Sequence, residues 1–153
     1  MSPRAAWRLE SLGLTDVYDF AAGKAAWLAA GLPIEGSDSI TPRAGEHARK
    51  DVPTCQLDEL LDAVRERVSA TGWDTCIVIN EQLTVLGRLG RSALSNSDAQ
   101  KVEEAMSAGP STIRPDTPLA TITQRLRDTG LSSALVTTLE GELVGIVLSA
   151  NVV

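Results

Sequence analysis

Histidine, cysteine and aromatic residues are all scarce in this chain of 153 residues, which has one His, two Cys, one Tyr, one Phe and three Trp. One histidine and two isolated cysteines do not supply the Cys/His cluster of a typical zinc site. They also leave no Ser–His–Asp arrangement, and neither a GxxxxGK loop nor a GxGxxG motif is present. The sequence therefore predicts no metal site and no catalytic residues.

Clustered basic residues and long apolar runs are lacking as well. The chain has 14 Lys and Arg against 20 Asp and Glu, with a net charge of −6 and a pI near 4.8. Duplex nucleic acid is an unsuitable partner for such a chain, because phosphate binding needs a basic stripe. The N-terminus carries charges where a signal peptide needs an apolar segment, and no apolar run approaches the length of a bilayer span. We expect a cytoplasmic protein with no membrane partner and an aliphatic core.

What the sequence does contain is a repeat at an offset of 58 residues without a gap. The matched identities are Thr54/Thr112, Asp58/Asp116, Leu61/Leu119, Arg67/Arg125, Thr71-Gly72/Thr129-Gly130, Val78/Val136 and Gly87/Gly145. A period of this length indicates one supersecondary unit used twice. Two such units usually pack about a pseudo-two-fold axis, and the groove between them is the natural place for a ligand.

Each unit has the pattern of a strand–helix–strand–strand element. In unit 1 the ranges are an extended 52–55, a helix over 57–70, a strand over 76–79 and its partner over 85–89. In unit 2 they are an extended 112–113, a helix that Pro118 opens, and strands over 134–138 and 143–147. Glycines end both helices, and a tight hairpin turn joins each strand pair. A connecting helix is predicted over about 97–106, with Ser97 as its cap.

The N-terminal third is different in character. Its pattern predicts a helix over 3–13, a short strand over 17–20 and a helix over 23–30. Residues 36–51 are polar and contain Gly, Ser and Pro, which is the composition of a linker, and His47 is expected to be exposed there. The stretch LGLTDVYDFAAGKAAWLAAGLPIEG, at 12–36, resembles the closing segment of a rhodanese domain. That resemblance would imply sulfur transfer only with a cysteine just upstream, and the chain has none before Cys55.

The repeat, with "M.…P.T…P..PL" before the second helix and "VTT..G.LVGIV" after it, resembles a pair of CBS domains. The resemblance implies an α/β (α+β) fold: a tandem CBS-domain pair of two βαββ-type units about a pseudo-two-fold axis, plus a short N-terminal helix–strand–helix arm. It divides the chain into a rhodanese-tail-like arm (1–36), a linker (37–51), CBS unit 1 (52–94), a connecting helix (95–109) and CBS unit 2 (110–153).

The resemblance also implies a ligand in the cleft between the units, of the kind AMP, ADP, ATP or S-adenosylmethionine. The family pattern, together with three arginines near the expected cleft, gives these candidate ligand-binding residues: Thr54, Cys55, Asp74, Thr75, Arg88, Arg91, Thr112, Ile113, Arg114, Ser133, Ala134 and Asn151. The family's Thr and Asp after the second strand are replaced here by Leu148 and Asn151 in unit 2 and by Gly90 and Ala93 in unit 1. Neither unit therefore keeps the carboxylate that accepts the ribose hydroxyls.

The two cysteines fit best as small apolar side chains, because Ile113 and Ala134 occupy the equivalent positions of unit 2. A thiol switch or a disulfide is the alternative, since Cys55 precedes a helix N-terminus.

Three functions stay open at this point. The first is a non-catalytic regulatory module that senses an adenine-containing ligand and acts on a regulated partner protein. The second is a ligand-free interaction module that forms a homodimer through helix faces such as Leu61/Val68 and Leu119/Leu126. The third is a sulfurtransferase, for which the cysteine loop is missing.

Overall fold

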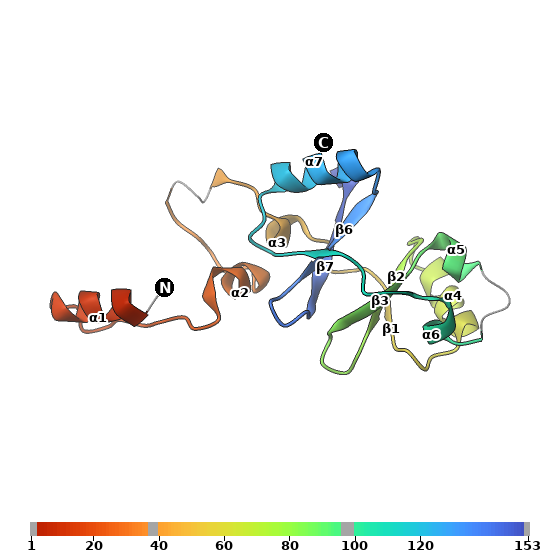
Figure 1. Cartoon of the computed structure of the whole chain (residues 1–153), viewed down its shortest axis with the longest axis horizontal. Coiled ribbons are helices and arrows are strands. Elements are labelled where there is room, and N and C mark those ends of the chain that lie inside the picture. The colour runs from red at the N-terminus through yellow and green to blue at the C-terminus, as the bar shows by residue number, and fades with distance from the viewer. Residues whose placement is uncertain (1–2, 37–39, 96–99, 152–153) are drawn as a thin grey trace.

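The computed structural model describes residues 3–36, 40–95 and 100–151 of the chain. Two sheets lie side by side in it, each with a helix packed on it, and an N-terminal arm projects from this pair (Figure 1). The first sheet has the strand order β1-β2-β3-β4, formed by Thr54–Cys55, Cys76–Ile79, Val85–Leu89 and Ser107–Ala108. The second has the order β5-β6-β7, formed by Thr112–Ile113, Ser133–Thr137 and Leu143–Leu148. The long helices are α4 (Leu61–Ser69) and α7 (Leu119–Thr129).

The strand register repeats at the predicted offset of 58 residues. In unit 1, β1 runs parallel to β2 with Thr54 opposite Ile77, and in unit 2, β5 runs parallel to β6 with Thr112 opposite Leu135. The antiparallel pairs β2–β3 and β6–β7 match position by position, including a bulge after Val78 in one and after Val136 in the other. The prediction of two copies of one folding element is confirmed.

The hairpin turns of the two units bond to each other. The N–H of Leu143 donates to the carbonyl of Leu83 over 2.9 Å, and the N–H of Val85 donates to the carbonyl of Gly141 over 2.9 Å. These four residues are equivalent in pairs at the offset of 58, so one bond becomes the other when the units are exchanged. A pseudo-two-fold axis therefore passes between the two turns.

Apolar side chains form one core inside each unit and a third core between them. Val52, Ile77, Ile79, Leu135 and Ile146 make the core between the sheets. Leu61, Val68 and Leu126 belong to the cores inside the units and are almost fully buried, while Leu119 packs against the core of unit 2. The predicted dimerisation through these helix faces is therefore wrong, because the faces are already covered by the chain's own sheets.

The segment before unit 1 is part of the fold, not a linker. It forms α3 (Ala44–His47), the equivalent of α6 (Val102–Ala105) at the offset of 58. The N–H of Ala44 donates to the carbonyl of Thr117, just as the N–H of Val102 donates to the carbonyl of Glu59. The N–H of Arg49 donates to the carbonyl of Ile146 over 2.9 Å and its carbonyl accepts from the N–H of Ile146 over 3.0 Å.

Each unit is therefore completed by the segment that precedes the other unit in the sequence, an arrangement we call the exchange. Residues 43–49 complete unit 2 in the way that residues 101–107 complete unit 1, where β4 pairs with β3. Their polar composition hid this role, because most of their bonds to unit 2 are made by the backbone, with the Arg43 side chain adding one to the carbonyl of Asp116, and only Arg43, Ala44 and Gly45 are buried. The exposed His47 agrees with its predicted environment.

Three further predicted elements differ from the structure. Residues 17–20 do not form a strand, since no neighbouring strand pairs with them, and Phe20 instead packs edge-to-face on Trp27 with ring centroids 5.4 Å apart. The helix over 57–70 begins later, at Leu61. In the described part of the predicted connecting helix only α6 is helical: Gln100 and Lys101 are not, Ser107–Ala108 form β4, and the short α5 (Arg91–Leu94) precedes the predicted segment. Ser97, its predicted cap, lies outside the described residues.

The arm consists of α1 (Pro3–Ser11) and α2 (Gly23–Ala29), both close to their predicted ranges. Helix α2 docks on its own chain through Leu28, which is 2% exposed. It approaches α3 so closely that a Cβ on Gly45 would lie 3.0 Å from the carbonyl oxygen of Leu28. Helix α1 buries no residue.

The exchange makes a testable prediction about two equivalent glycines. A Cβ on Gly145 would lie 2.5 Å from the carbonyl oxygen of Arg49, whereas a Cβ on Gly87 would lie 2.4 Å from the sulfur of Met106, the end of a flexible side chain. We expect Gly145→Ala to lower the free energy of unfolding by about 2–3 kcal/mol and Gly87→Ala by about 1 kcal/mol. Urea unfolding followed by circular dichroism measures both, and equal losses would contradict this role of the segment 43–49.

Candidate functional site

A pocket of about 340 Å³ opens between the two units. Unit 1 supplies the segment 71–75, unit 2 supplies Ser132, Ser133 and the residues 148–150 at the end of β7, and Arg49 and Arg88 complete the lining. The residues 71–75 join α4 to β2, and Ser132 and Ser133 lie at the equivalent point before and at the start of β6. The pocket therefore lies in the predicted groove, with walls from both copies of the repeat.

Arg88 is the central charged group of this pocket. Its Nε donates to the hydroxyl of Thr75 and one terminal nitrogen donates to the hydroxyl of Ser133, each over 2.9 Å. The Thr75 hydroxyl in turn donates to the carbonyl of Leu89 over 2.9 Å, which fixes it as an acceptor for Arg88. Because Thr75 and Ser133 are equivalent residues of the two units, one guanidinium group holds both units together.

The environment of Arg88 is unusual for a cation. The side chain is half-buried, and within the described part of the chain no carboxylate forms a salt bridge with it. Loss of solvation by burial lowers the pKa of the guanidinium from its ordinary value, and the charge of Asp74 opposes this effect. Arginine stays protonated at neutral pH even so. The pocket thus holds a positive charge that only hydroxyl groups and a more distant carboxylate stabilise.

Arg49 and Trp73 form the rim. The Arg49 guanidinium lies over the Trp73 ring at 4.3 Å from its centroid and pairs with the carboxylate of Asp51, with Nε and Oδ1 2.9 Å apart. The hydrogen bond to Asp51 raises the pKa of Arg49, and the same bond lowers the pKa of Asp51. Trp73 is half-buried and packs against two of the cores, so it faces the pocket and the interior at once.

The structure brings four of the twelve predicted ligand-binding residues to this pocket: Asp74, Thr75, Arg88 and Ser133. Seven others lie elsewhere: Thr54, Cys55, Arg91, Thr112, Ile113, Arg114 and Ala134. The backbone of Asn151 ends the turn η2 (Ser149–Asn151), and its side chain lies outside the described residues.

The arginines away from the pocket have other partners. Arg91 is exposed and pairs with Asp74 over 2.9 Å. Arg114 donates to the carbonyl of Thr138 and, over 3.1 Å, to the hydroxyl of Thr137. Of the three arginines named from the sequence, Arg88 alone lines the pocket between the units.

Sequence reasoning missed both Arg49 and Trp73 as lining residues of this pocket. Extending the repeat upstream would have placed Arg49 opposite Ser107, but the only identity in that stretch is Glu46 with Glu104. Both glutamates take part in a capping box at the start of their short helices. This shared capping box was the one sequence signal that the repeat extends upstream to Arg49.

The two cysteines lie in the core of unit 1, where Cys55 is 2% exposed and Cys76 is not exposed. Their thiols interact, and the contact with Cys76 together with burial raises the pKa of the Cys55 thiol, while the same contact lowers the pKa of the Cys76 thiol. Both are free thiols. Their surroundings are those of small apolar side chains, as the repeat indicated.

Within residues 3–36, 40–95 and 100–151, no group of three or more His, Cys, Asp or Glu side chains is placed to hold a metal ion. The helices of those residues include none with the length and apolar character needed to span a bilayer.

Burial predicts how the thiols react. In the native protein we expect less than about a tenth of the two thiols to react with a chromogenic disulfide reagent within minutes, because neither sulfur is accessible to the reagent. In urea both should react at once. Rapid native labelling of either cysteine would contradict its place in the core.

Comparison with known protein families gives a match for the second unit of the repeat. The family model for the CBS domain matches residues 102–153, which is unit 2 with α6 in front of it. A search of curated proteins finds no significant match.

Solved structures of several proteins share the fold. The cytosolic domain of the Mg²⁺ channel MgtE in complex with ATP has a TM-score of 0.67 at 19% identity; the match covers 76% of this chain and 50% of that one, so this chain spans about half its length. CBSX2 from Arabidopsis thaliana has a TM-score of 0.65 at 19% identity, and the match covers 73% of this chain and 92% of CBSX2. The CBS domain pair of MJ0100 in complex with 5′-methylthioadenosine and S-adenosyl-L-methionine has a TM-score of 0.65 at 15% identity. The match covers 72% of this chain and 92% of the MJ0100 chain.

Proposed function

Residues 102–153 are a CBS domain and the chain has the fold of a CBS-domain pair, and we propose on this basis that it is a non-catalytic regulatory module. Its ligand is an adenine nucleotide or an S-adenosyl compound, bound in the pocket between the units. The observation that carries the proposal is Arg88, a half-buried cation at the junction of both units with hydroxyl partners and no ion pair among the described residues.

An anion in the pocket would improve the energetics of Arg88. A buried charge without a counter-charge costs free energy, and a charge-assisted hydrogen bond to a ligand recovers part of it. The other terminal nitrogen of Arg88 bonds to neither Thr75 nor Ser133, and the side chain lines the pocket between the units. A phosphate or carboxylate group on the ligand suits this position, because the planar guanidinium can bind it through two nitrogens.

The ligands of the similar structures support the same chemistry. ATP is bound to the MgtE cytosolic domain, AMP to CBSX2, and 5′-methylthioadenosine and S-adenosylmethionine to the MJ0100 pair. All four contain adenosine. We propose Asp74, Thr75, Arg88 and Ser133 as the centre of the site, with Trp73 and Arg49 at its rim.

The pocket also indicates that binding is weak. Leu148 lines it where the family has a threonine, and Asn151 stands where the family has the ribose-binding aspartate. Each charge-assisted bond lost costs about 1.5–3 kcal/mol, or roughly tenfold or more in affinity. We therefore expect dissociation constants well above the nanomolar range.

The second candidate is an interaction module that forms a homodimer or binds a regulated partner protein, in the cytoplasm. The arm favours it, because α1 buries no residue and Trp7 and Leu12 are among its exposed apolar side chains. Sulfur transfer has little support, since both cysteines are buried in the core of unit 1.

Isothermal titration calorimetry with AMP, ADP, ATP and S-adenosylmethionine tests the ligand. We expect micromolar to millimolar binding of at least one, and a loss of about tenfold or more for Arg88→Ala, because the charged partner of the anion is removed. Arg125→Ala is the matched control, since Arg125 is exposed on α7 and bonds to Ser111 away from the pocket. The ligand proposal fails if no compound gives heat, or if both variants bind like wild type.

A further inference from the structure

The two units differ in what covers them. On unit 2, helix α2 of the arm lies against α3, and both Gly45 and Pro115 are buried beneath it. The equivalent residues of unit 1 at the offset of 58 are Glu103 and Leu57. Glu103 is exposed and Leu57 is half-buried, since no helix of the arm covers them.

The uncovered surface of unit 1, formed by Leu57, Leu60 and Glu103, is both apolar and acidic. Leu60 is 61% exposed. The backbone places the three side by side, because the N–H of Glu103 donates to the carbonyl of Leu57 and Leu60 bridges to Lys101. Glu103 forms no ion pair with any described residue. We call this surface the α6 patch.

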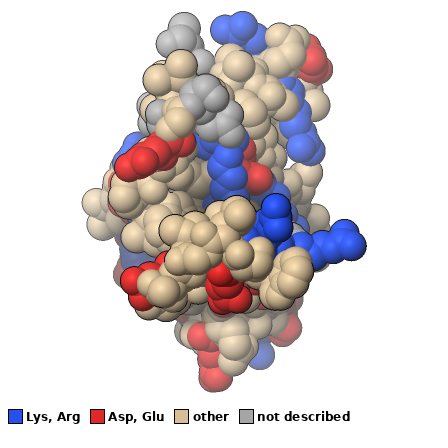
Figure 2. All heavy atoms as spheres, turned by 90° about the vertical axis from the view of Figure 1, so that its left-hand side faces the viewer, with Lys and Arg blue, Asp and Glu red and all other residues tan. Residues whose placement is uncertain are grey.

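Helix α1 has the complementary chemistry. At 100° per residue Arg4, Trp7 and Arg8 share one face of the helix. Trp7 is 68% exposed, and Arg8 has no salt bridge within the described part of the chain. Figure 2 looks at the molecule from the end where α1 projects, and Lys and Arg side chains gather at one side of that view. Exposed Trp beside Arg is the composition that dominates binding energy at protein interfaces.

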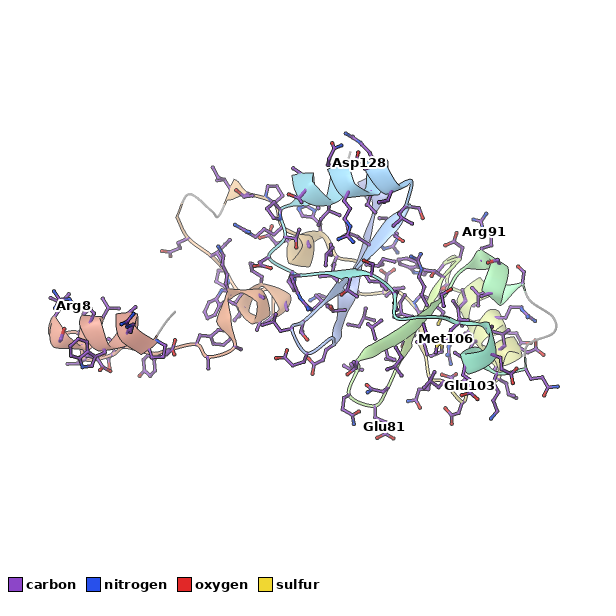
Figure 3. The ribbon with its side chains drawn as sticks, in the orientation of Figure 1. Arg8, Glu81, Arg91, Glu103, Met106 and Asp128 are labelled. Atoms are coloured by element: carbon purple, nitrogen blue, oxygen red, sulfur yellow. The ribbon has the colours of Figure 1, made fainter. Side chains whose placement is uncertain are left out.

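Helix α1 does not reach the α6 patch of its own chain. Figure 3 shows Arg8 at one end of the molecule and Glu103, with Met106 beside it, at the other. We propose that α1 binds the α6 patch of a second copy of this chain, with Trp7 against Leu57 and Leu60 and Arg8 paired with Glu103. The arm then covers both units of the repeat: its α2 on unit 2 of its own chain, and its α1 on unit 1 of the partner.

The exchange is reciprocal in a two-fold dimer, because each chain offers one α1 and one α6 patch. The inference rests on the self-association part of the proposed function and is independent of the ligand. The inference assigns self-association to α1 and the α6 patch, because the apolar faces of α4 and α7 are buried and cannot contact a second chain.

Charge reversal tests the pairing. We expect wild type to dimerise in sedimentation velocity, and Arg8→Glu and Glu103→Arg each to weaken the dimer about tenfold or more, because each places like charges together. The double variant R8E/E103R should recover to within about threefold of wild type. Arg125→Glu is the control and should leave the dimer unchanged. Trp7→Ala should weaken the dimer, and the charge swap R8E/E103R should not restore it in that background.

The outcomes separate the surface from the self-association. A wild-type dimer that the single variants do not weaken, or that the double variant does not restore, overturns the α1–α6 pairing while self-association stands. A wild-type monomer at every concentration up to hundreds of micromolar overturns both, and the calorimetric result for the nucleotide is unaffected by either.

Discussion

The backbone pairing of Arg49 with Ile146 is the constraint on which the rest of the structure depends. It is a reciprocal pair of hydrogen bonds, at 2.9 and 3.0 Å, between a segment that precedes unit 1 and the last strand of unit 2. With it come α3, which fills the place on unit 2 that α6 fills on unit 1, and the Arg49 side chain, which reaches the rim of the pocket. Each net backbone bond contributes only about 1 kcal/mol, so the segment acts by bringing several of them together with the buried Ala44 and Gly45. The first and last parts of the repeat are thereby fixed to each other.

This closure explains why the pocket has walls from both units. Val52, Ile77, Ile79, Leu135 and Ile146 hold the sheets against each other in the middle, and the hairpin turns bond to each other at one end. The remaining space lies where the loops before β2 and β6 meet, and there the polar side chains of Thr75 and Ser133 face Arg88. A groove of this kind follows from packing two like units about an axis, and its chemistry follows from the few positions at which the units differ.

The sequence was sufficient to predict the repeat and the hairpin of each unit, because identities such as Gly87 with Gly145 extend without a gap through both hairpins. It was not sufficient to predict the exchange, since residues 43–49 and 101–107 share one identity. Which unit a segment packs against is also not encoded in its local hydrophobic periodicity. Residues 17–20 were also mispredicted because tertiary contacts decide their structure. Tyr18 and Phe20 favour a strand, but a strand forms only where another strand can pair with it. For the site, equivalence with the family pattern located the groove through Thr75 and Ser133. The same pattern also assigned Cys55 and Ile113 to the ligand, whereas the structure buries both in the cores of their units, as their apolar equivalence in the repeat had indicated.

The asymmetry of the pocket has an electrostatic and steric cause. Arg88 of unit 1 corresponds to Ile146 of unit 2, and its guanidinium already bonds to Thr75 and Ser133, which are themselves equivalent. An arginine at position 146 would need the same two hydroxyl groups from the opposite side, and two guanidinium charges would then share one partly buried space. Like charges at such a distance disfavour each other's charged form, and burial adds to that cost. A repeat of this geometry therefore favours a cation at the junction from one unit only, and the uncharged Ile146 at the partner position is buried in the core between the sheets. The two-fold packing thus accounts for the contribution of Arg88 from unit 1 alone, and the anionic group of the proposed ligand would bind at this guanidinium.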